Sequence, residues 1–379
     1  PRKVWVSYYE GRAAEIGGGG YDRAGELASL SSLQSSGSVV LADDPSQTID
    51  ARVAPLFAAG VTSVVIDLSV NERRDLSILN VPAGATLELR CRNFHQALVS
   101  TKGATGPCLV RLADGAKLIL NGVLLRGAIT VERVAPADAS QTRTGAAVEL
   151  RHCTLVPGIS LAPDGSPILP GIPSVSLSTG VGGGLSLHLC KCIAGPLRVP
   201  GATVTASDTV LDCAGAGRGS ASSDVLIAQT AKLSRVTVIG TATLAALDTT
   251  VDTLFCEPVS APGGTSGAVS YSFLPAGSNV PGPVKCQPDV AIAEARAAGG
   301  NTARVAAQTL PWFTSRRYGT AGYGLLSPRC CAALRSGGSD EGEIGAMHNL
   351  QRSQRAACLS SSLRDYLRFG INLRVIYVS

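Results

Sequence analysis

Short strand-like runs, separated by only a few residues, dominate the middle of this chain. They end at Gly, Pro, Asn or Asp and cover residues 86–91, 108–112, 117–120, 122–126, 128–131, 147–156, 185–193, 202–213, 233–239, 244–247, 251–256 and 267–273. Antiparallel sandwiches space their turns about 8–12 residues apart. Several strands within roughly 20 residues indicate a repeating solenoid instead. This spacing therefore predicts that the chain winds its strands into stacked coils.

Three of the runs resemble one another as sequences. Residues 149–158, 187–195 and 207–215 each form an alternating strand closed by a small residue and glycine, and glycine supplies the left-handed backbone that a coil corner requires. About ten coils stacked about 4.8 Å apart would bury a continuous column of side chains. The composition, 45% hydrophobic but only 4% aromatic, suits such a narrow aliphatic core. We expect a mainly β fold, a right-handed parallel β-helix of the pectin-lyase-like solenoid type.

Changes in composition divide the chain into three parts. We expect an N-terminal segment over residues 1–55, the parallel β-helix over 56–280, and a C-terminal mixed helical docking module over 281–379. Residues 4–8 predict a strand, 17–20 a linker and 21–33 a helix, whereas 157–184, rich in Pro, Gly and Ser, predict a loop that leaves the coil.

The C-terminal module predicts two helices and a final strand. One helix spans about 289–298, and a second begins near Ser339 and ends before Gly370, which suits a C′ position. The second helix carries an apolar stripe, and an alternating strand follows it over 371–378. The stripe consists of Ile344, Met347, Leu350, Leu359, Leu363 and Leu367.

Charge and hydropathy bear on the partners of this chain. The net charge of +5 is spread thinly, without the basic stripe and interleaved aromatics of nucleic-acid binders, so we expect no nucleic-acid partner. No apolar run reaches 18 residues, so we expect no membrane span. The eleven cysteines do not form a small disulfide framework, which favours reduced core thiols and synthesis in a cytosol.

Carboxylates are the residues that would make a β-helix an enzyme, either a polysaccharide lyase or a glycoside hydrolase. Asp208 with Asp212, and Asp248 with Asp252, repeat the same spacing. Each pair spans about 13 Å along a strand, too far for a glycosidase pair, whose carboxyl groups lie roughly 5–9.5 Å apart. Asp208 and Asp248 could approach to about 10 Å across two coils. The alternative is that these aspartates satisfy backbone amides at turns, and we expect no catalytic residue.

Cysteine and histidine gather in the C-terminal module as Cys330, Cys331, His348 and Cys358. No Cys-x-x-Cys accompanies them, and adjacent cysteines chelate one zinc poorly, so packing thiols are the simpler interpretation. The glycines at 17–20 lack the Gly-Lys-Ser/Thr ending of a phosphate loop. We therefore expect neither a metal nor a cofactor.

An aromatic and arginine cluster is the most interface-like part of the sequence, because Trp, Tyr and Arg dominate protein interfaces. The alternative is that it packs the module against the last coil. The cluster consists of Trp312, Phe313, Arg316, Arg317, Tyr318 and Tyr323.

Several segments resemble one family. They are residues 148–158, the junction 269–277 leading to Cys286-Gln-Pro-Asp289, and the tail segments 313–319, 322–327, 343–348 and 366–370. Together they are similar to uncharacterised β-helix proteins encoded among the baseplate and tail genes of phage-tail-like contractile injection systems. The resemblance covers about residues 80–379. Asn372-Leu-Arg-Val375 stands where that family has a Leu-Glu-Ala-Gly-like run, which leaves the local partner contact open.

The resemblance implies a structural or accessory component of a particle and brings no catalytic residues with it. We expect a non-enzymatic protein, made in the cytoplasm, that joins an assembled particle through residues 281–379. Its partners would be other subunits of the tail-like particle, copies of itself, or both. A polysaccharide-degrading enzyme and an adhesin that binds a surface glycan are the alternatives.

Overall fold

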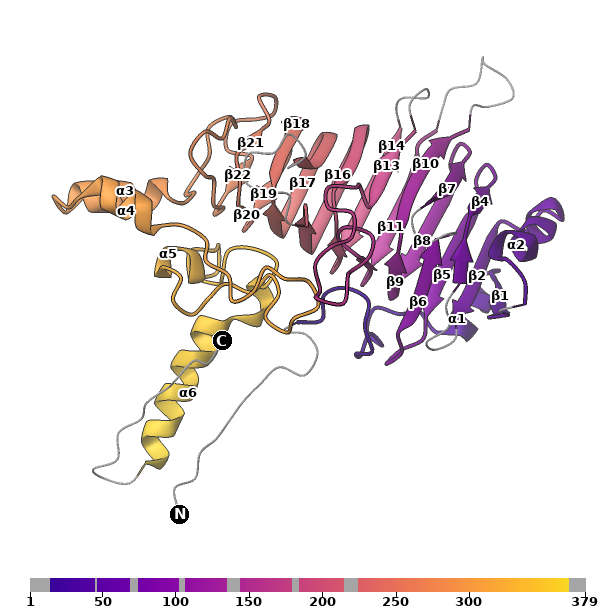
Figure 1. Cartoon of the computed structure of the whole chain (residues 1–379), viewed down its shortest axis with the longest axis horizontal. Helices are drawn as coiled ribbons and strands as arrows, with labels where there is room; N and C mark the ends of the chain where they lie inside the picture. The colour runs from indigo at the N-terminus through magenta and orange to yellow at the C-terminus, as the bar shows by residue number, and fades with distance from the viewer. Residues whose placement is uncertain are drawn as a thin grey trace.

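A computed structural model describes residues 14–44, 46–68, 74–101, 106–134, 144–178, 184–214 and 224–367. The fold is mainly β, with one long sheet of many strands, and every ladder between its described strands is parallel. In Figure 1 the strands stand side by side along the length of the molecule. The expected mainly β fold is confirmed, and residues 185–256 contain parallel ladders where hairpins would have contradicted it.

The strands fall into three columns, each a series of hydrogen-bonded parallel strands. Strands that follow one another in sequence mostly belong to different columns. The first column contains β1 (Val39–Ala42), β2 (Ser63–Leu68), β5 (Thr86–Cys91), β8 (Lys117–Asn121), β11 (Ala146–Arg151), β14 (Leu185–Cys190), β19 (Thr250–Val251) and β22 (Val269–Ser270). The second contains β3 (Arg74–Leu76), β6 (Ala97–Thr101), β9 (Val123–Arg126), β12 (Thr154–Leu155), β15 (Ile193–Ala194) and β20 (Leu254–Phe255).

The third column contains β4 (Ile78–Val81), β7 (Pro107–Leu112), β10 (Ala128–Arg133), β13 (Val175–Leu177), β18 (Thr241–Leu247) and β21 (Val259–Ser260). Two long strands, β16 (Leu197–Asp212) and β17 (Asp224–Ile239), pass through all three columns in turn. Val, Leu and Ala side chains of every column meet in one continuous core, as their alternation along the strands predicts.

The N-terminal part differs from the prediction. The expected helix over 21–33 is wrong: only α1 (Leu30–Ser35) is helical, because Tyr21, Arg23 and Glu26 bind the sheet instead. α2 (Ile49–Ala58) was not foreseen. Its Ile49 and Val53 are buried in the main core at the N-terminal end of the sheet. The strand predicted over 4–8 lies outside the described residues.

The C-terminal part contains α3 (Asp289–Ala297), α4 (Thr302–Gln308), α5 (Ala332–Arg335), a 3-10 turn η1 (His348–Leu350) and α6 (Arg352–Tyr366). The helix predicted from Asp289 is confirmed. The helix predicted from Ser339 is wrong, because α6 begins only at Arg352. Gly370 and the strand predicted over 371–378 lie outside the described residues.

Residues 339–350 pack on the sheet rather than forming a helix. Ile344 and Met347, only 1% and 5% exposed, enter two apolar clusters between the C-terminal module and the second column. Gly345 has a φ of +115°, and a Cβ there would come within 2.6 Å of Thr237 Oγ1. This close approach stops a regular helix, so the predicted apolar stripe is divided between the packed segment and α6.

Candidate functional site

A line of seven residues in left-handed backbone conformation runs along the bend between the first and second columns. We call it the ladder: His152, Lys191, Asp208, Arg235, Asp252, Tyr271 and Lys285, with φ angles between 48° and 55°. Each ladder residue directly follows a strand residue that pairs with the equivalent strand residue of a neighbouring layer. Arg151 pairs with Cys190, for example, and Ser207 with Ser234. Successive ladder residues are therefore about 4.8 Å apart.

A small side chain after the ladder residue closes the bend in most layers. Thr209 Oγ1 donates to the carbonyl of Ser207 at 2.7 Å, Ser272 Oγ does the same for Ser270 at 2.8 Å, and Cys192 Sγ bonds the carbonyl of Cys190. A left-handed residue other than glycine costs roughly 1–2 kcal/mol. The predicted left-handed glycine is confirmed at Gly158 but wrong at Gly195, which has no positive φ. Along the ladder polar side chains occupy the bend instead, which puts their functional groups in one row.

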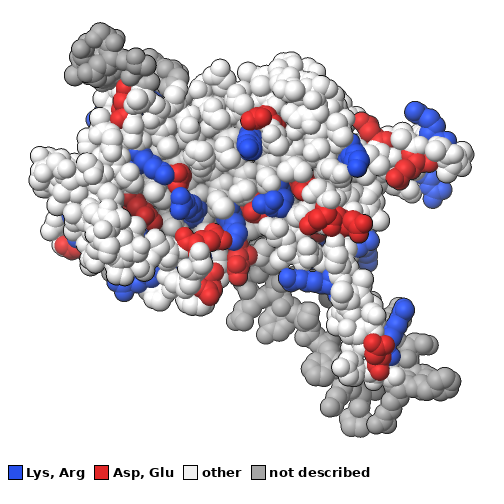
Figure 2. Space-filling view, turned by 180° about the vertical axis from the view of Figure 1, so that it is seen from behind, with Lys and Arg blue, Asp and Glu red and all other residues white. Residues whose placement is uncertain are grey.

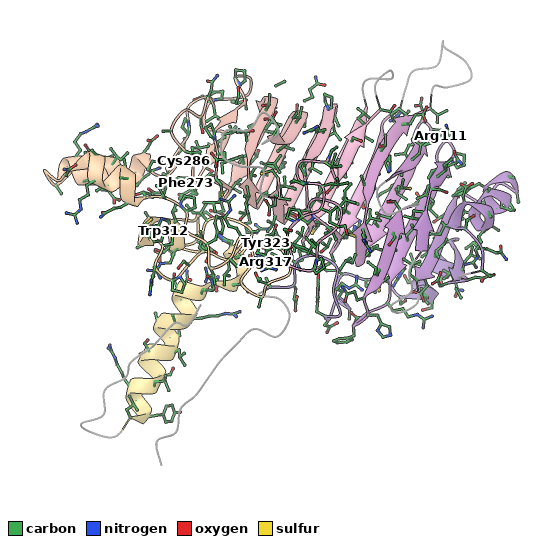
Figure 3. The ribbon with its side chains drawn as sticks, viewed as in Figure 1. Arg111, Phe273, Cys286, Trp312, Arg317 and Tyr323 are labelled. Carbon is green, nitrogen blue, oxygen red and sulfur yellow. The ribbon has the colours of Figure 1, made fainter. Side chains whose placement is uncertain are left out.

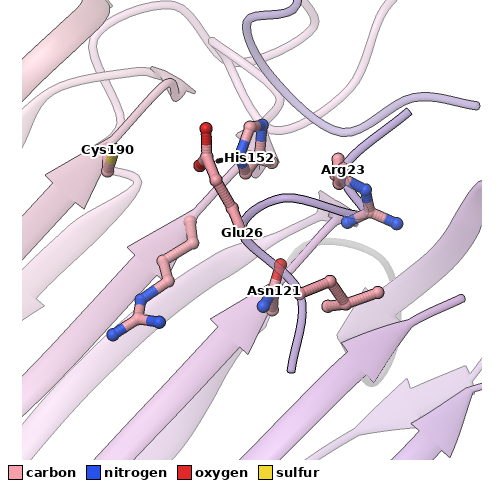
Figure 4. A pocket seen from close by; sticks show the side chains of 7 residues that line it. Arg23, Glu26, Asn121, His152 and Cys190 are labelled. Carbon is pink, nitrogen blue, oxygen red and sulfur yellow. Dashed lines mark hydrogen bonds and ion pairs between the residues drawn. The ribbon is translucent and has the colours of Figure 1, made fainter. Parts of the chain in front are cut away.

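The N-terminal strap, residues 14–27, binds the first rungs of the ladder. Glu26 bonds Nε2 of His152 at 2.6 Å and also the ammonium of Lys191. The hydroxyl of Tyr21 lies 2.9 Å from Nδ1 of His152, and the amide of Gly17 donates to the carbonyl of Lys191. Figure 4 shows the contact between Glu26 and His152. Both residues line a pocket of about 240 Å³, together with Arg23 and Asn121.

Titration of this end follows from burial and charge. Burial lowers the pKa of His152 below its ordinary 6.5, and the positive charges of Lys191 and Arg23 act in the same direction. Burial opposes ionisation of Glu26, yet hydrogen bonds from Lys191 and His152 keep the pKa of its carboxyl below 4.5. The strap is thus held by a carboxylate that faces one cation and one mostly neutral imidazole.

The C-terminal module binds the later rungs. Asp208 accepts two bonds from Arg235, at 2.7 and 3.0 Å, and one from Nδ2 of Asn349 at 2.8 Å. Asp252 accepts from both the amide and the hydroxyl of Ser339 at 2.7 Å.

His348 lies beside this contact. Its Nε2 is 2.9 Å from Asp340 and 3.9 Å from Asp252, and its Nδ1 faces the carbonyl of Glu343. The ladder therefore anchors segments from both ends of the described chain, and this anchoring offsets its backbone strain.

The four candidate aspartates do not converge. Val251 pairs with Ser234, so Asp252, the residue after Val251, lies on the ladder two layers from Asp208. Asp248 follows Leu247, which pairs with Ala231, and so lies off the ladder. Arg235 lies between Asp208 and Asp252, and Asp248 is exposed. Asp212 accepts a 2.7 Å bond from the Tyr323 hydroxyl, and burial raises the pKa of its carboxyl. The suggested approach of Asp208 to Asp248 is replaced by an Asp208–Arg235–Asp252 series.

The aromatic cluster is divided by the fold. Tyr323 is 6% exposed and packs edge-on against Tyr318, with ring centres 5.6 Å apart. Arg316 and Arg317 are exposed, and Arg317 approaches the loop at Gly165. Trp312 is 60% exposed. Figure 3 shows Trp312 near Phe273 and Tyr323 closer to the middle of the sheet. Packing against the fold is therefore confirmed for Tyr323, whereas an interface role for the exposed Trp312, Arg316 and Arg317 stays a prediction.

A groove of about 330 Å³ lies beside Trp312, between the last layers of the sheet and the C-terminal module. It is lined by Cys256, Glu257, Phe273, Pro275, Leu310, Pro311, Trp312, Phe313 and Arg316. The sequence indicated Trp312, Phe313 and Arg316 but gave no sign that Glu257 and Phe273 would join them, because they come from a different segment.

The suggested metal ligands do not form one site, although Cys330 and Cys331 are neighbours. Cys330 is buried in an apolar cluster, Cys358 is exposed on α6, and His348 is held by Asp340 and Glu343. Across the ranges that the structure describes, no three His, Cys, Asp or Glu side chains are grouped to hold a metal ion. All eleven cysteines are free, which agrees with the expected reduced thiols.

The ladder itself was not predicted. Its signal in the sequence is an alternating strand followed by a polar residue and then Cys, Thr or Ser, as in His152-Cys153, Asp208-Thr209 and Asp252-Thr253.

On the face in Figure 2, acidic and basic side chains are interspersed. Among the described residues no helix is long and apolar enough to cross a membrane. Comparison with protein-family models, curated proteins and solved structures gave no match.

Proposed function

We propose that the three columns are the three faces of a right-handed parallel β-helix. The support is the order in which the chain visits them: β5, β6 and β7 occupy the first, second and third columns, and β8, β9 and β10 repeat that order. β16 and β17 each make a full circuit within a single strand. A single coil cannot bury its inward side chains, but stacked coils that enclose one continuous core can bury them.

We propose that this scaffold is a non-enzymatic assembly component that attaches through its C-terminal helices. One observation carries the proposal: α3, α4 and α6 contribute no buried side chain. Figure 1 shows α3 and α4 extending beyond one end of the sheet and α6 projecting away from it. Helices in globular proteins are stabilised mainly by packing an apolar face. α3 and α4 contact each other, but neither they nor α6 fully bury a side chain within the described chain.

α6 is the clearest docking element. It has 15 residues, near the length at which an isolated helix is marginal in water, and Gln351 provides no side-chain cap. Ala356, Leu359, Leu363 and Tyr366 follow the 3-4-3 spacing of a coiled-coil seam. Leu359 is 53% exposed and Tyr366 86% exposed. A partner helix packed on this seam would give α6 the burial it lacks.

Two further considerations favour a particle component over an enzyme. Asp208, Asp212 and Asp252 are each engaged in hydrogen bonds that hold the fold together, so their geometry suits anchoring. The segments that resemble β-helix proteins of phage-tail-like contractile injection systems include residues 343–348, which pack on the second column. We therefore place this chain in such a particle, bound to other subunits, to copies of itself, or to both.

The test uses particles purified from cells that make the whole system. Leu359→Glu should remove the chain from the sedimenting particle fraction, because the charge falls on the seam. Ser361→Glu, which adds the same charge to the opposite, exposed face of α6, should leave it there. Retention of the Leu359→Glu chain would refute docking through α6, and absence of the unmodified chain from the particles would refute the particle assignment itself.

A further inference from the structure

The groove beside Trp312 combines aromatic walls with a rim of opposite charges. Phe273, only 1% exposed, forms its floor, while Leu310 and Trp312 remain 46% and 60% exposed. Large apolar side chains left in water at a concave site are a common mark of ligand binding. Trp312 lies on a paired segment, since its carbonyl accepts from the amide of Ser327 at 2.6 Å, so the ring is presented by ordered backbone.

The size of the groove favours a small ligand over a folded partner. Its volume of about 330 Å³ is at the lower end of the ~300–1,000 Å³ of small-molecule sites, whereas a stable protein interface buries about 800 Å² per partner. Backbone groups near the groove are already used: the amide of Cys256 bonds Val238, and that of Phe273 bonds Thr253. An extended peptide that binds by strand addition would need such groups.

The charges at the rim narrow the ligand class. Glu257 and Arg316 line the same groove, so its formal charge is zero. A ligand of either sign would be repelled by one of the two, while hydroxyl groups can donate to the carboxylate and accept from the guanidinium. The C–H face of a sugar ring, with its slightly positive hydrogens, suits the negative face of an indole ring.

We propose that this groove binds a neutral saccharide. The indole of Trp312 stacks on the sugar ring, Phe273 and Phe313 close the apolar side, and Glu257 and Arg316 take the hydroxyl groups. This site is separate from the seam of α6, so it adds a ligand to the particle component without depending on how that component assembles.

Tryptophan fluorescence of the full-length chain is a direct test. The chain has two tryptophans, so in a Trp5→Phe background Trp312 is the reporter. Titration with maltohexaose, cellohexaose, xylohexaose and mannohexaose should give a saturable change with at least one sugar, and polygalacturonate should bind more weakly. Calorimetry should show at least about a tenfold loss of affinity in Arg316→Gln, the loss of one hydrogen bond to a charged group. Trp312→Ala should lose at least as much, because it removes the stacked ring.

Arg317→Gln is the matched control, because Arg317 is the next residue but does not line the groove. The Arg317→Gln chain should bind the sugar normally. The Leu359→Glu chain should bind it normally too, because that substitution affects the attachment of α6 to the particle and not the groove. No saturable response to any of the four neutral sugars would overturn the proposal. So would binding that survives Trp312→Ala, or a groove that binds a proline-rich peptide and no sugar.

Discussion

Replacing Arg352 by Met should loosen the segment that joins α6 to the sheet, by an amount that depends on pH. The guanidinium of Arg352 pairs with Glu343 through both Nε and Nη2 and also donates to the carbonyl of Leu326 at 2.8 Å. Glu343 is 3% exposed. Burial raises the pKa of its carboxyl above 4.5 even with Arg352 beside it, so removal of the cation leaves a buried charge that keeps the amide of Leu326 as a hydrogen-bond donor but loses its ion pair.

Protonation of Glu343 limits the cost. Giving a proton at pH 7 to a group whose ordinary pKa is 4.5 costs about 3.4 kcal/mol, at about 1.36 kcal/mol for each pH unit. The buried charge can therefore cost no more than about 3.4 kcal/mol at pH 7 and about 0.7 kcal/mol at pH 5. Loss of the bond from the guanidinium to Leu326, a hydrogen bond that involves a charged group, adds about 1.5–3 kcal/mol at either pH.

Hydrogen exchange followed by mass spectrometry measures this locally. After correction for intrinsic exchange rates, the free energy of opening of residues 339–352 should fall by up to about 6.4 kcal/mol at pH 7 and up to about 3.7 kcal/mol at pH 5. In a Glu343→Gln background, Arg352→Met should cost about the same at both pH values. A loss in the Arg352→Met chain that does not change between pH 7 and pH 5 would refute the buried-charge argument.

Two further predictions concern the ladder. Asp252→Asn should make residues 339–348 more sensitive to proteolysis, because it weakens two hydrogen bonds from Ser339. Each of these bonds has a charged acceptor and contributes about 1.5–3 kcal/mol. The control Asp248→Asn should have no effect, and equal sensitivity of the two variants would contradict the pairing of Val251 with Ser234 that puts Asp252 on the ladder. Acidification should release the N-terminal strap. The pKa of His152 is lowered when the strap is docked, so the undocked form binds the proton more tightly. Protection of residues 14–27 from hydrogen exchange should therefore fall as the pH drops below 6.5, and fall further below pH 4.5 as Glu26 is protonated. Protection that rises on acidification would show that His152 is docked as the imidazolium.

The sequence alone was sufficient for local features. Alternation of Val, Leu and Ala with polar residues gave the strands of 185–256, because inward and outward positions must differ along a strand that borders a core. The Pro-rich linker followed by an Ala-rich run gave α3. The cluster around Trp312 could be recognised because large rings are otherwise rare in this chain, but which of its members are exposed was left open.

Other features depended on contacts between segments far apart in sequence. Seventeen residues separate Cys192 from Thr209 in the next layer, but 27 separate Asp208 from Arg235, so no fixed repeat reveals that Asp252, and not Asp248, completes the series. The length of each excursion between layers is set by its loops, and loop length carries little free energy.

The same limit explains the errors in the helices. Residues 21–33 and 339–350 have helical patterns, yet Glu26 gains hydrogen bonds to Lys191 and His152 on the ladder, and Ile344 and Met347 gain burial against the second column. Helix propensity differs by less than about 1 kcal/mol per residue, whereas burying one large apolar side chain stabilises by about 1.5–3 kcal/mol. Sequence pattern thus determined which residues face a core, and tertiary packing decided which core they face.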